Sequence, residues 1–125
     1  MVTTSPQTEI FEAVTIRYSR DHVIGRLAVI ELVDSAGQVR RVQWLKRWSA
    51  DGLDFGGETE QDLDAARSIL VAIGYTDPAK GLCHEFRAAF VAPVPDYGGE
   101  QSVESMHLWV RGYVEKVEGR LNGKK

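Results

Sequence analysis

Residue types that could carry out catalysis are few in this chain, and most stand alone. The single cysteine, Cys83, is followed directly by His84, a pair that could supply a nucleophile and a base. Neighbours on a helix point about 100° apart, however, which does not favour a hydrogen bond between the two side chains. His22 and His107 are isolated, and no paired ligand spacing predicts a zinc site. We therefore expect a protein that is not an enzyme, with no catalytic residue, no metal and no cofactor.

Acidic residues are concentrated in residues 51–64, a stretch with six acids and no base. Glycines within it precede a predicted helix, an arrangement that can bind phosphate through backbone amides. The carboxylates would repel an anion, and the sequence matches neither a phosphate loop nor a calcium loop. The alternatives are a solvated helix start, which the helix dipole favours, and a surface that binds a basic partner. This candidate acidic patch consists of Asp51, Asp54, Glu58, Glu60, Asp62 and Asp64.

Basic and aromatic side chains are interleaved in residues 40–48. Such residues can grip phosphates and stack on bases, and they are also typical of protein–protein hot spots. The alternative is one tryptophan in the core with the basic side chains in solvent. A formal net charge of −3 makes direct nucleic-acid binding an unfavoured function. The candidate basic and aromatic site consists of Arg40, Arg41, Trp44, Lys46, Arg47 and Trp48.

Apolar residues recur at helical spacing in the C-terminal segment, at Val103, Met106, Val110, Val114, Val117 and Leu121. Residues 106–110 could also alternate as a strand, but the longer pattern favours a helix. This seam could pack on the sheet or pair with a second copy in a homodimer, and flanking aromatic residues widen it. The candidate residues for self-association are Val103, Met106, Trp109, Val110, Tyr113 and Val117.

The sequence pattern of the N-terminal half predicts β-strands, which would position the basic and aromatic side chains. Alternation predicts a first strand with Ile10, Glu12, Val14, Ile16 and Tyr18 on one face. A second run, residues 24–33, ends at the turn residues Asp34 to Gly37, and a third run follows from Val39 to Trp44. Two runs joined by a short glycine-containing turn predict a β-hairpin.

The sequence pattern of the second half predicts helices. Thr59 is a predicted N-cap, with Leu63, Ala66, Leu70 and Ile73 as the buried stripe and Gly74 as the stop. Asp77 and Pro78 predict a second helix start, with Leu82, Phe86 and Phe90 as its stripe and Pro93 as its end. Residues 93–99 are predicted to be a loop.

Length and composition suit one small domain. The chain has 125 residues, and its single cysteine excludes an internal disulfide. It lacks an apolar run long enough to span a membrane and a secretory signal, so we expect a cytoplasmic protein without membrane contact. We predict a loose tail over residues 1–8 and one α+β domain over residues 9–125. Its architecture would be an antiparallel meander of about three strands followed by about three helices packed on one face.

Residues 49–93 resemble a domain-of-unknown-function family of short phage and bacterial proteins. The matching features are the turn from Gly52 to Gly57, the Leu/Ala-rich helix with Leu63, Ala66, Ile69 and Leu70, and the pair Phe86-Arg87. Phe55 stands where the family has tryptophan, and residues 58–61 lack its proline. The resemblance implies a small hairpin-plus-helices fold and a mobile-element context, and it implies no activity.

Together these features predict a phage or mobile-element accessory protein that binds a host protein or complex stoichiometrically. An inhibitor of a host defence complex, of the anti-CRISPR type, would fit this description. The alternative is a small-ligand or nucleotide-binding module with its site between the Arg40/Arg41 hairpin and the glycine loop, either within one chain or across a dimer.

Overall fold

A four-stranded antiparallel sheet and three α-helices make up the fold, so the predicted α+β class is confirmed. The computed structural model describes residues 11–23, 25 and 27–122, and the predicted tail over residues 1–8 lies outside this part. In chain order the elements are β1 (Ala13–Asp21), β2 (Leu27–Asp34), β3 (Val39–Arg41), α1 (Glu60–Ala72), α2 (Lys80–Phe86), the π-helical continuation η2 (Arg87–Val91), β4 (Gly99–Ser102) and α3 (Val103–Asn122).

The hairpin of β2 and β3 forms where the turn residues predict it. Asp34 Oδ1 accepts the amides of Ala36 and Gln38 at 3.0 and 2.8 Å, and the amide of Gly37 donates to the Asp34 carbonyl. β3 is shorter than expected, since its ladder ends at Arg41. Trp44 therefore belongs to the loop that follows, not to the strand.

The predicted alternation of β1 is only partly correct. Ile16 and Tyr18 are buried as expected. The register against β2 shifts between Ala13 and Thr15, and the intervening Val14 is 44% exposed. An extra residue in one strand reverses which face the residues before it occupy. Ile10 lies outside the described residues.

The fourth strand, β4, occupies residues that the sequence pattern leaves as a loop or a helix start. It pairs antiparallel with β1 and makes the sheet order β3-β2-β1-β4. Its Gln101 accepts a hydrogen bond from the Tyr18 hydroxyl at 2.6 Å and donates to the Phe90 carbonyl at 2.6 Å. The residues of β4 carry no apolar signal, so this strand depends on its partners.

Both ends of α1 are as predicted. Thr59 is the N-cap, because its Oγ1 accepts the amide of Asp62 at 3.3 Å. At the other end Gly74 has φ +119°, its amide donates to the Val71 carbonyl and the Tyr75 amide donates to Leu70. This pair of bonds is the Schellman motif, which requires a left-handed residue after the helix.

The predicted start of α2 is wrong by two residues. The helix begins at Lys80 with Ala79 as a cap that has no side-chain bond. Asp77 adopts φ +47°, and its carboxylate lies 3.6 Å from the Arg67 guanidinium. The Asp77 side chain therefore faces α1 and does not cap α2. The helical segment ends at Val91, two residues before Pro93.

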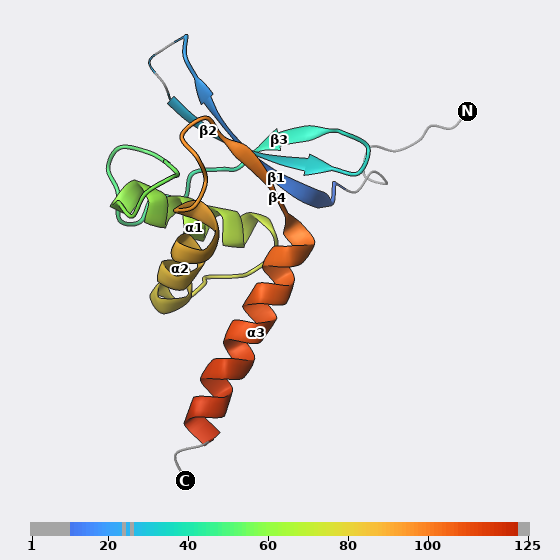
Figure 1. The fold of residues 1–125 in the computed structure, drawn as a ribbon, viewed down its shortest axis with the longest axis vertical. Helices are drawn as coiled ribbons and strands as arrows, with labels where there is room; N and C mark the ends of the chain where they lie inside the picture. The colour runs from blue at the N-terminus through green and yellow to red at the C-terminus, as the bar shows by residue number, and fades with distance from the viewer. Residues whose placement is uncertain (1–10, 24, 26, 123–125) are drawn as a thin grey trace, which may run out of the picture.

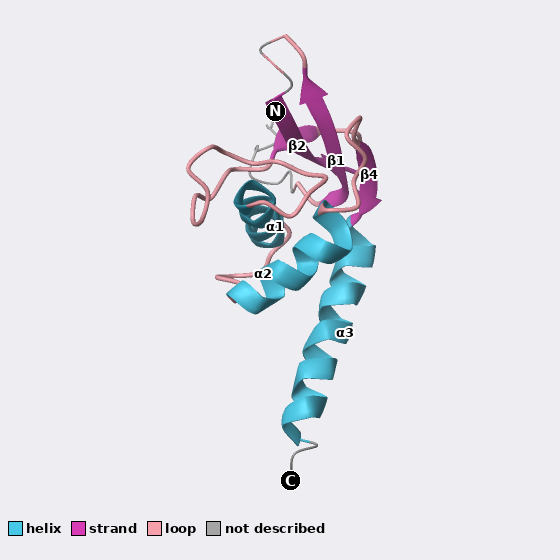
Figure 2. Cartoon of the chain, turned by 60° about the vertical axis from the view of Figure 1, so that its left-hand side comes forward, coloured by secondary structure: helices cyan, strands magenta, loops and turns pink. Residues whose placement is uncertain are grey.

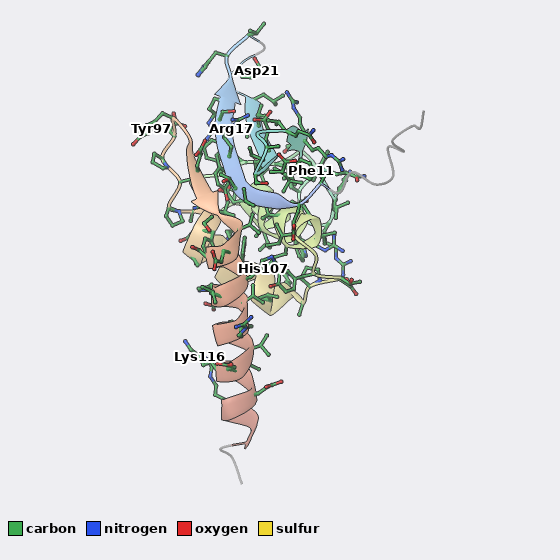
Figure 3. The ribbon with its side chains drawn as sticks, turned by 90° about the vertical axis from the view of Figure 1, so that its right-hand side faces the viewer. Phe11, Arg17, Asp21, Tyr97, His107 and Lys116 are labelled. Carbon is green, nitrogen blue, oxygen red and sulfur yellow. The ribbon has the colours of Figure 1, made fainter. Side chains whose placement is uncertain are left out.

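Residues 103–122 form one helix, as the longer pattern predicts. The first half of α3 packs on the domain, whereas its second half extends beyond every other element (Figure 1). Figure 3 shows His107 beside the body of the domain and Lys116 on the projecting half.

The three helices lie to one side of the sheet, as Figure 2 shows, and the core lies between them and the sheet. The sheet contributes Ile16, Tyr18, Ile30 and Leu32, and the helices contribute Leu63, Ile69, Leu70, Phe86, Met106 and Val110. Among the described helices, none has the length and apolar composition that crossing a bilayer requires.

Candidate functional site

A buried carboxylate organises the loop between β3 and α1. Asp64 lies in α1 and is fully buried. Its two oxygens accept the backbone amides of Arg47, Trp48 and Ser49 at 3.3, 2.9 and 3.1 Å, and the Trp44 indole nitrogen at 3.0 Å. Four donors converge on one carboxylate, which is how a buried negative charge is stabilised without a cation.

A second bond from α1 fixes the same loop. The hydroxyl of Ser68, one turn after Asp64, accepts the amide of Leu45 at 2.9 Å. The backbone from residue 45 to residue 49 is therefore held by the helix beneath it. The Cα positions from which the side chains of this segment extend are therefore fixed before any partner binds.

Basic and aromatic side chains extend from this loop. Lys46 and Arg47 are exposed, and Trp44 is 36% exposed although its indole nitrogen donates to Asp64. The structure adds Lys80 of α2, which the sequence pattern did not indicate: its Nζ lies 5.7 Å from the centre of the Trp48 ring, and Arg47 lies 5.9 Å from the same ring. We call Trp44, Lys46, Arg47, Trp48 and Lys80 the basic loop cluster.

The two arginines of β3 have other neighbours than the residues of the basic loop cluster. Arg40 stacks over Phe11, with its guanidinium carbon 4.3 Å from the ring centre. Arg41 lies opposite Glu31 in the strand register, and Glu31 already accepts Arg17 at 3.0 Å. Lys46, Arg47 and Lys80 form no ion pair with another described residue, and the same is true of Arg40, Arg41, Arg87, Arg111, Lys116 and Arg120.

Three of the six predicted acidic-patch residues are engaged within the fold. Asp64 is buried as described, and Asp62 is also buried, where it accepts the Gly57 amide at 2.7 Å and the Thr59 hydroxyl. Asp54 forms a 2.6 Å ion pair with Arg20. These carboxylates do not form a common surface, and Asp51, Glu58 and Glu60 are the members that stay exposed.

The glycine loop uses its amides internally. The amide of Gly56 donates to the Val91 carbonyl at 2.9 Å, and that of Gly57 donates to Asp62. The amide of Phe55 donates to Asp54 at 2.8 Å. An anion would have to displace these bonds, so the loop does not offer a phosphate cradle.

The Cys83 and His84 side chains do not form a catalytic pair. Cys83 is fully buried, and burial raises the pKa of its thiol from 9.0 to about 11. Its sulfur has one weak contact, 3.9 Å from the Pro78 carbonyl, while His84 Nδ1 lies 3.3 Å from Arg87. A nucleophilic cysteine requires the opposite shift, toward the thiolate.

The predicted self-association residues are divided by the fold. Val103, Met106 and Val110 are buried in the core of their own chain, so they are not free to meet a second copy. Trp109 packs against Phe86 and Phe90, and Tyr113 stacks on Trp109 with 5.6 Å between ring centres. Val117, in the projecting half, is partly exposed.

An open groove of about 930 Å³ lies where α3 leaves the sheet. Its walls come from the start of β1, the end of α1 and the first half of α3, and His107 and Arg111 reach it from α3. The Tyr75 hydroxyl lies 2.7 Å from His107 Nδ1. Burial raises the pKa of Tyr75, an effect that nearby Arg111 partly opposes.

Within residues 11–23, 25 and 27–122, no group of three or more His, Cys, Asp or Glu side chains could hold a metal ion. No family model, curated protein or solved structure matches the chain. The arrangement of its side chains is therefore the basis for a functional proposal.

Proposed function

We propose that this protein acts without catalysis, by stoichiometric binding of a partner protein that presents an acidic surface. The observation that carries the proposal is the basic loop cluster on a backbone held by Asp64. Tryptophan and arginine are the side chains most enriched at binding hot spots. A loop that is already ordered loses less conformational entropy when it binds.

The charge balance of the cluster favours an acidic partner. Lys46, Arg47 and Lys80 carry positive charge without an internal acid to neutralise it among the described residues. Complementary charge accelerates association and selects the partner. We extend this proposal to a host defence complex as the partner, which this protein would inhibit in the manner of an anti-CRISPR protein.

The experiment compares partner recovery by charge-reversal variants of exposed residues. The test variant combines Lys46→Glu, Arg47→Glu and Lys80→Glu, and the control variant combines Asp51→Lys, Glu58→Lys and Glu60→Lys. Asp62 and Asp64 are left intact, because reversing a buried carboxylate would unfold the chain. Circular dichroism checks that both variants fold.

We expect the control variant to recover the same partner as the wild type from nuclease-treated host lysate, and the test variant to lose it. Recovery should also fall as the salt concentration rises, since exposed charges are screened. Equal recovery by both variants would count against the basic loop cluster. A partner recovered only from lysate without nuclease treatment would indicate nucleic acid as the ligand instead.

The second candidate function is a small-ligand module, and the groove beside His107 favours it. A mixture of apolar walls with a few polar groups is typical of ligand sites. A thermal-shift screen of nucleotides and small anionic metabolites tests it, because a ligand at 100 times its Kd adds about 2.7 kcal/mol of stability. A His107→Ala variant should lose any shift, and a screen without shifts would reject this candidate.

A further inference from the structure

The two halves of α3 differ in what covers their apolar seam. Val103, Met106 and Val110 are covered by the domain. Val114 and Val117 continue the same seam toward the C-terminal end of α3, and Val114 is 43% exposed. A seam of this spacing is the pattern by which helices pair in coiled coils.

Opposite charges flank this exposed seam at a spacing of two helical turns. Arg111 and Glu118 are seven residues apart, so they lie on the same side of the seam. Both are exposed, and neither forms an ion pair with another described residue. A helix edge with a cation at one end and an anion at the other is complementary to its own reversed copy.

We propose that the projecting half of α3 binds the same segment of a second copy, in an antiparallel pair with two-fold symmetry. Val114 of each chain packs against Val117 of the other. Reversing the direction places Glu118 of the second copy within one turn of Arg111, on the same side of the pair. The two-fold axis repeats this contact, so a symmetric pair contains two Arg111–Glu118 ion pairs.

The attachment of the domain at one end of α3 favours an antiparallel pair. Each domain is attached at the N-terminal end of its helix, so antiparallel helices place the two domains at opposite ends of the pair. A parallel pair would crowd both domains at one end and would separate Arg111 from Glu118. A hollow of about 370 Å³, lined by Tyr75, His107 and Val114 among others, lies beside this segment.

The proposed contact is short. Residues 111–118 and their neighbours cover about two to three turns, which is roughly 15 Å of helix. Stable complexes bury about 1,200 Å² or more, and this contact is smaller. We therefore expect a reversible, concentration-dependent dimer, with a Kd in the micromolar range. This surface is separate from the basic loop cluster, so the two proposals stand or fall independently.

Sedimentation equilibrium of the full chain, from micromolar concentration to about 1 mM, tests the pairing. The variants are Arg111→Glu, Glu118→Arg and the combination of both. Lys116→Glu is the control, because Lys116 is an exposed charge on the outer side of the same helical turn. All of these positions are exposed, and circular dichroism confirms that the helix is retained.

We expect each single reversal to weaken dimerisation about tenfold, since it places like charges together at two symmetric contacts. The double variant should recover the wild-type Kd, because it restores complementary pairs in the reversed order. Lys116→Glu should leave the Kd within about twofold. A wild type that stays monomeric throughout, or a double variant as weak as the single ones, would overturn the proposal.

Discussion

At the scale of single residues, one buried aspartate organises the surface that we propose as the binding site. Asp64 is fully buried, yet it receives four hydrogen bonds from the loop above it. Its role is to position Lys46 and Arg47, not to contact the partner. The Asp64 carboxylate therefore determines the conformation of this loop and is not part of the charged surface.

Replacing Asp64 tests this role. We expect Asp64→Asn to lower the free energy of unfolding by about 3 kcal/mol, because an amide brings two donors to a position that needs only acceptors. Urea denaturation followed by circular dichroism measures the change. Glu60→Asn, an exposed change in the same helix, should cost less than about 1 kcal/mol. Similar values for the two variants would contradict a structuring role for Asp64.

Cys83 provides a second prediction at this scale. A pKa raised by two units lowers the thiolate fraction, and hence labelling by a thiol reagent at pH 8, about 100-fold relative to the unfolded chain. Burial adds to this protection. The labelling rate in buffer is compared with that in concentrated urea. Equal rates would show that the thiol is open to solvent in the folded protein.

The same shift makes stability depend on pH. The folded state holds the Cys83 proton more tightly than the unfolded state does, so this contribution is complete below pH 9 and is lost as pH rises toward about 11. Burial raises the pKa of Tyr18 as well, so its effect has the same sign. We expect the urea midpoint to fall between pH 8 and pH 11, with a smaller fall in Cys83→Ala.

At the scale of elements, β4 shows how a strand can form without its own sequence signal. Its chain enters the sheet through Gly98, which has φ +99°. A Cβ at that position would lie 2.2 Å from the Tyr18 carbonyl oxygen. Close backbone approach to β1 is therefore possible only with glycine.

A pair of alanine variants tests this explanation. Gly98→Ala should destabilise the protein by more than about 2 kcal/mol, because both the backbone conformation and the contact with Tyr18 oppose a side chain. Gly99→Ala is the matched control, since a Cβ there meets nothing within 4 Å. Thermal unfolding distinguishes them, and a comparable loss in both would refute the steric explanation.

At the scale of the whole molecule, α3 joins a packed segment to a projecting one. Met106 and Val110 belong to the core, whereas the C-terminal half of the helix extends past the other elements (Figure 1). The core should consequently be complete without the projecting half. Stability and self-association are then separate properties of two parts of the same helix.

Truncation separates these two properties. Removing residues 115–125 should change the free energy of unfolding by less than about 1 kcal/mol, because none of residues 115–120 belongs to the buried core. Met106→Ala should instead cost about 2–5 kcal/mol, because it leaves a cavity in the core. Denaturant unfolding measures both, and sedimentation should show that the truncated chain is monomeric. A truncated chain that unfolds would mean that the projecting half supports the domain.

Interactions within a few residues of one another were predictable from the sequence alone. The Asp34 turn, the Thr59 cap and the Gly74 stop each depend on neighbours fewer than six positions away. The α+β class and the helical form of residues 103–122 follow from the same local patterns. The spacing of residue types along the chain indicates such interactions directly, because the interacting residues are close in sequence.

What the tertiary structure decided depends on residues far apart in the chain. β4 exists because it pairs with β1, more than 80 positions away, and the Asp77 carboxylate faces Arg67 of α1 instead of capping α2. The same holds for the acidic stretch: Asp64 is buried because the loop at residues 44–49 folds over it. Burial and pairing depend on which residues are close in space. Aspartates of the same stretch are therefore either exposed charges or buried hydrogen-bond acceptors, and the fold decides which.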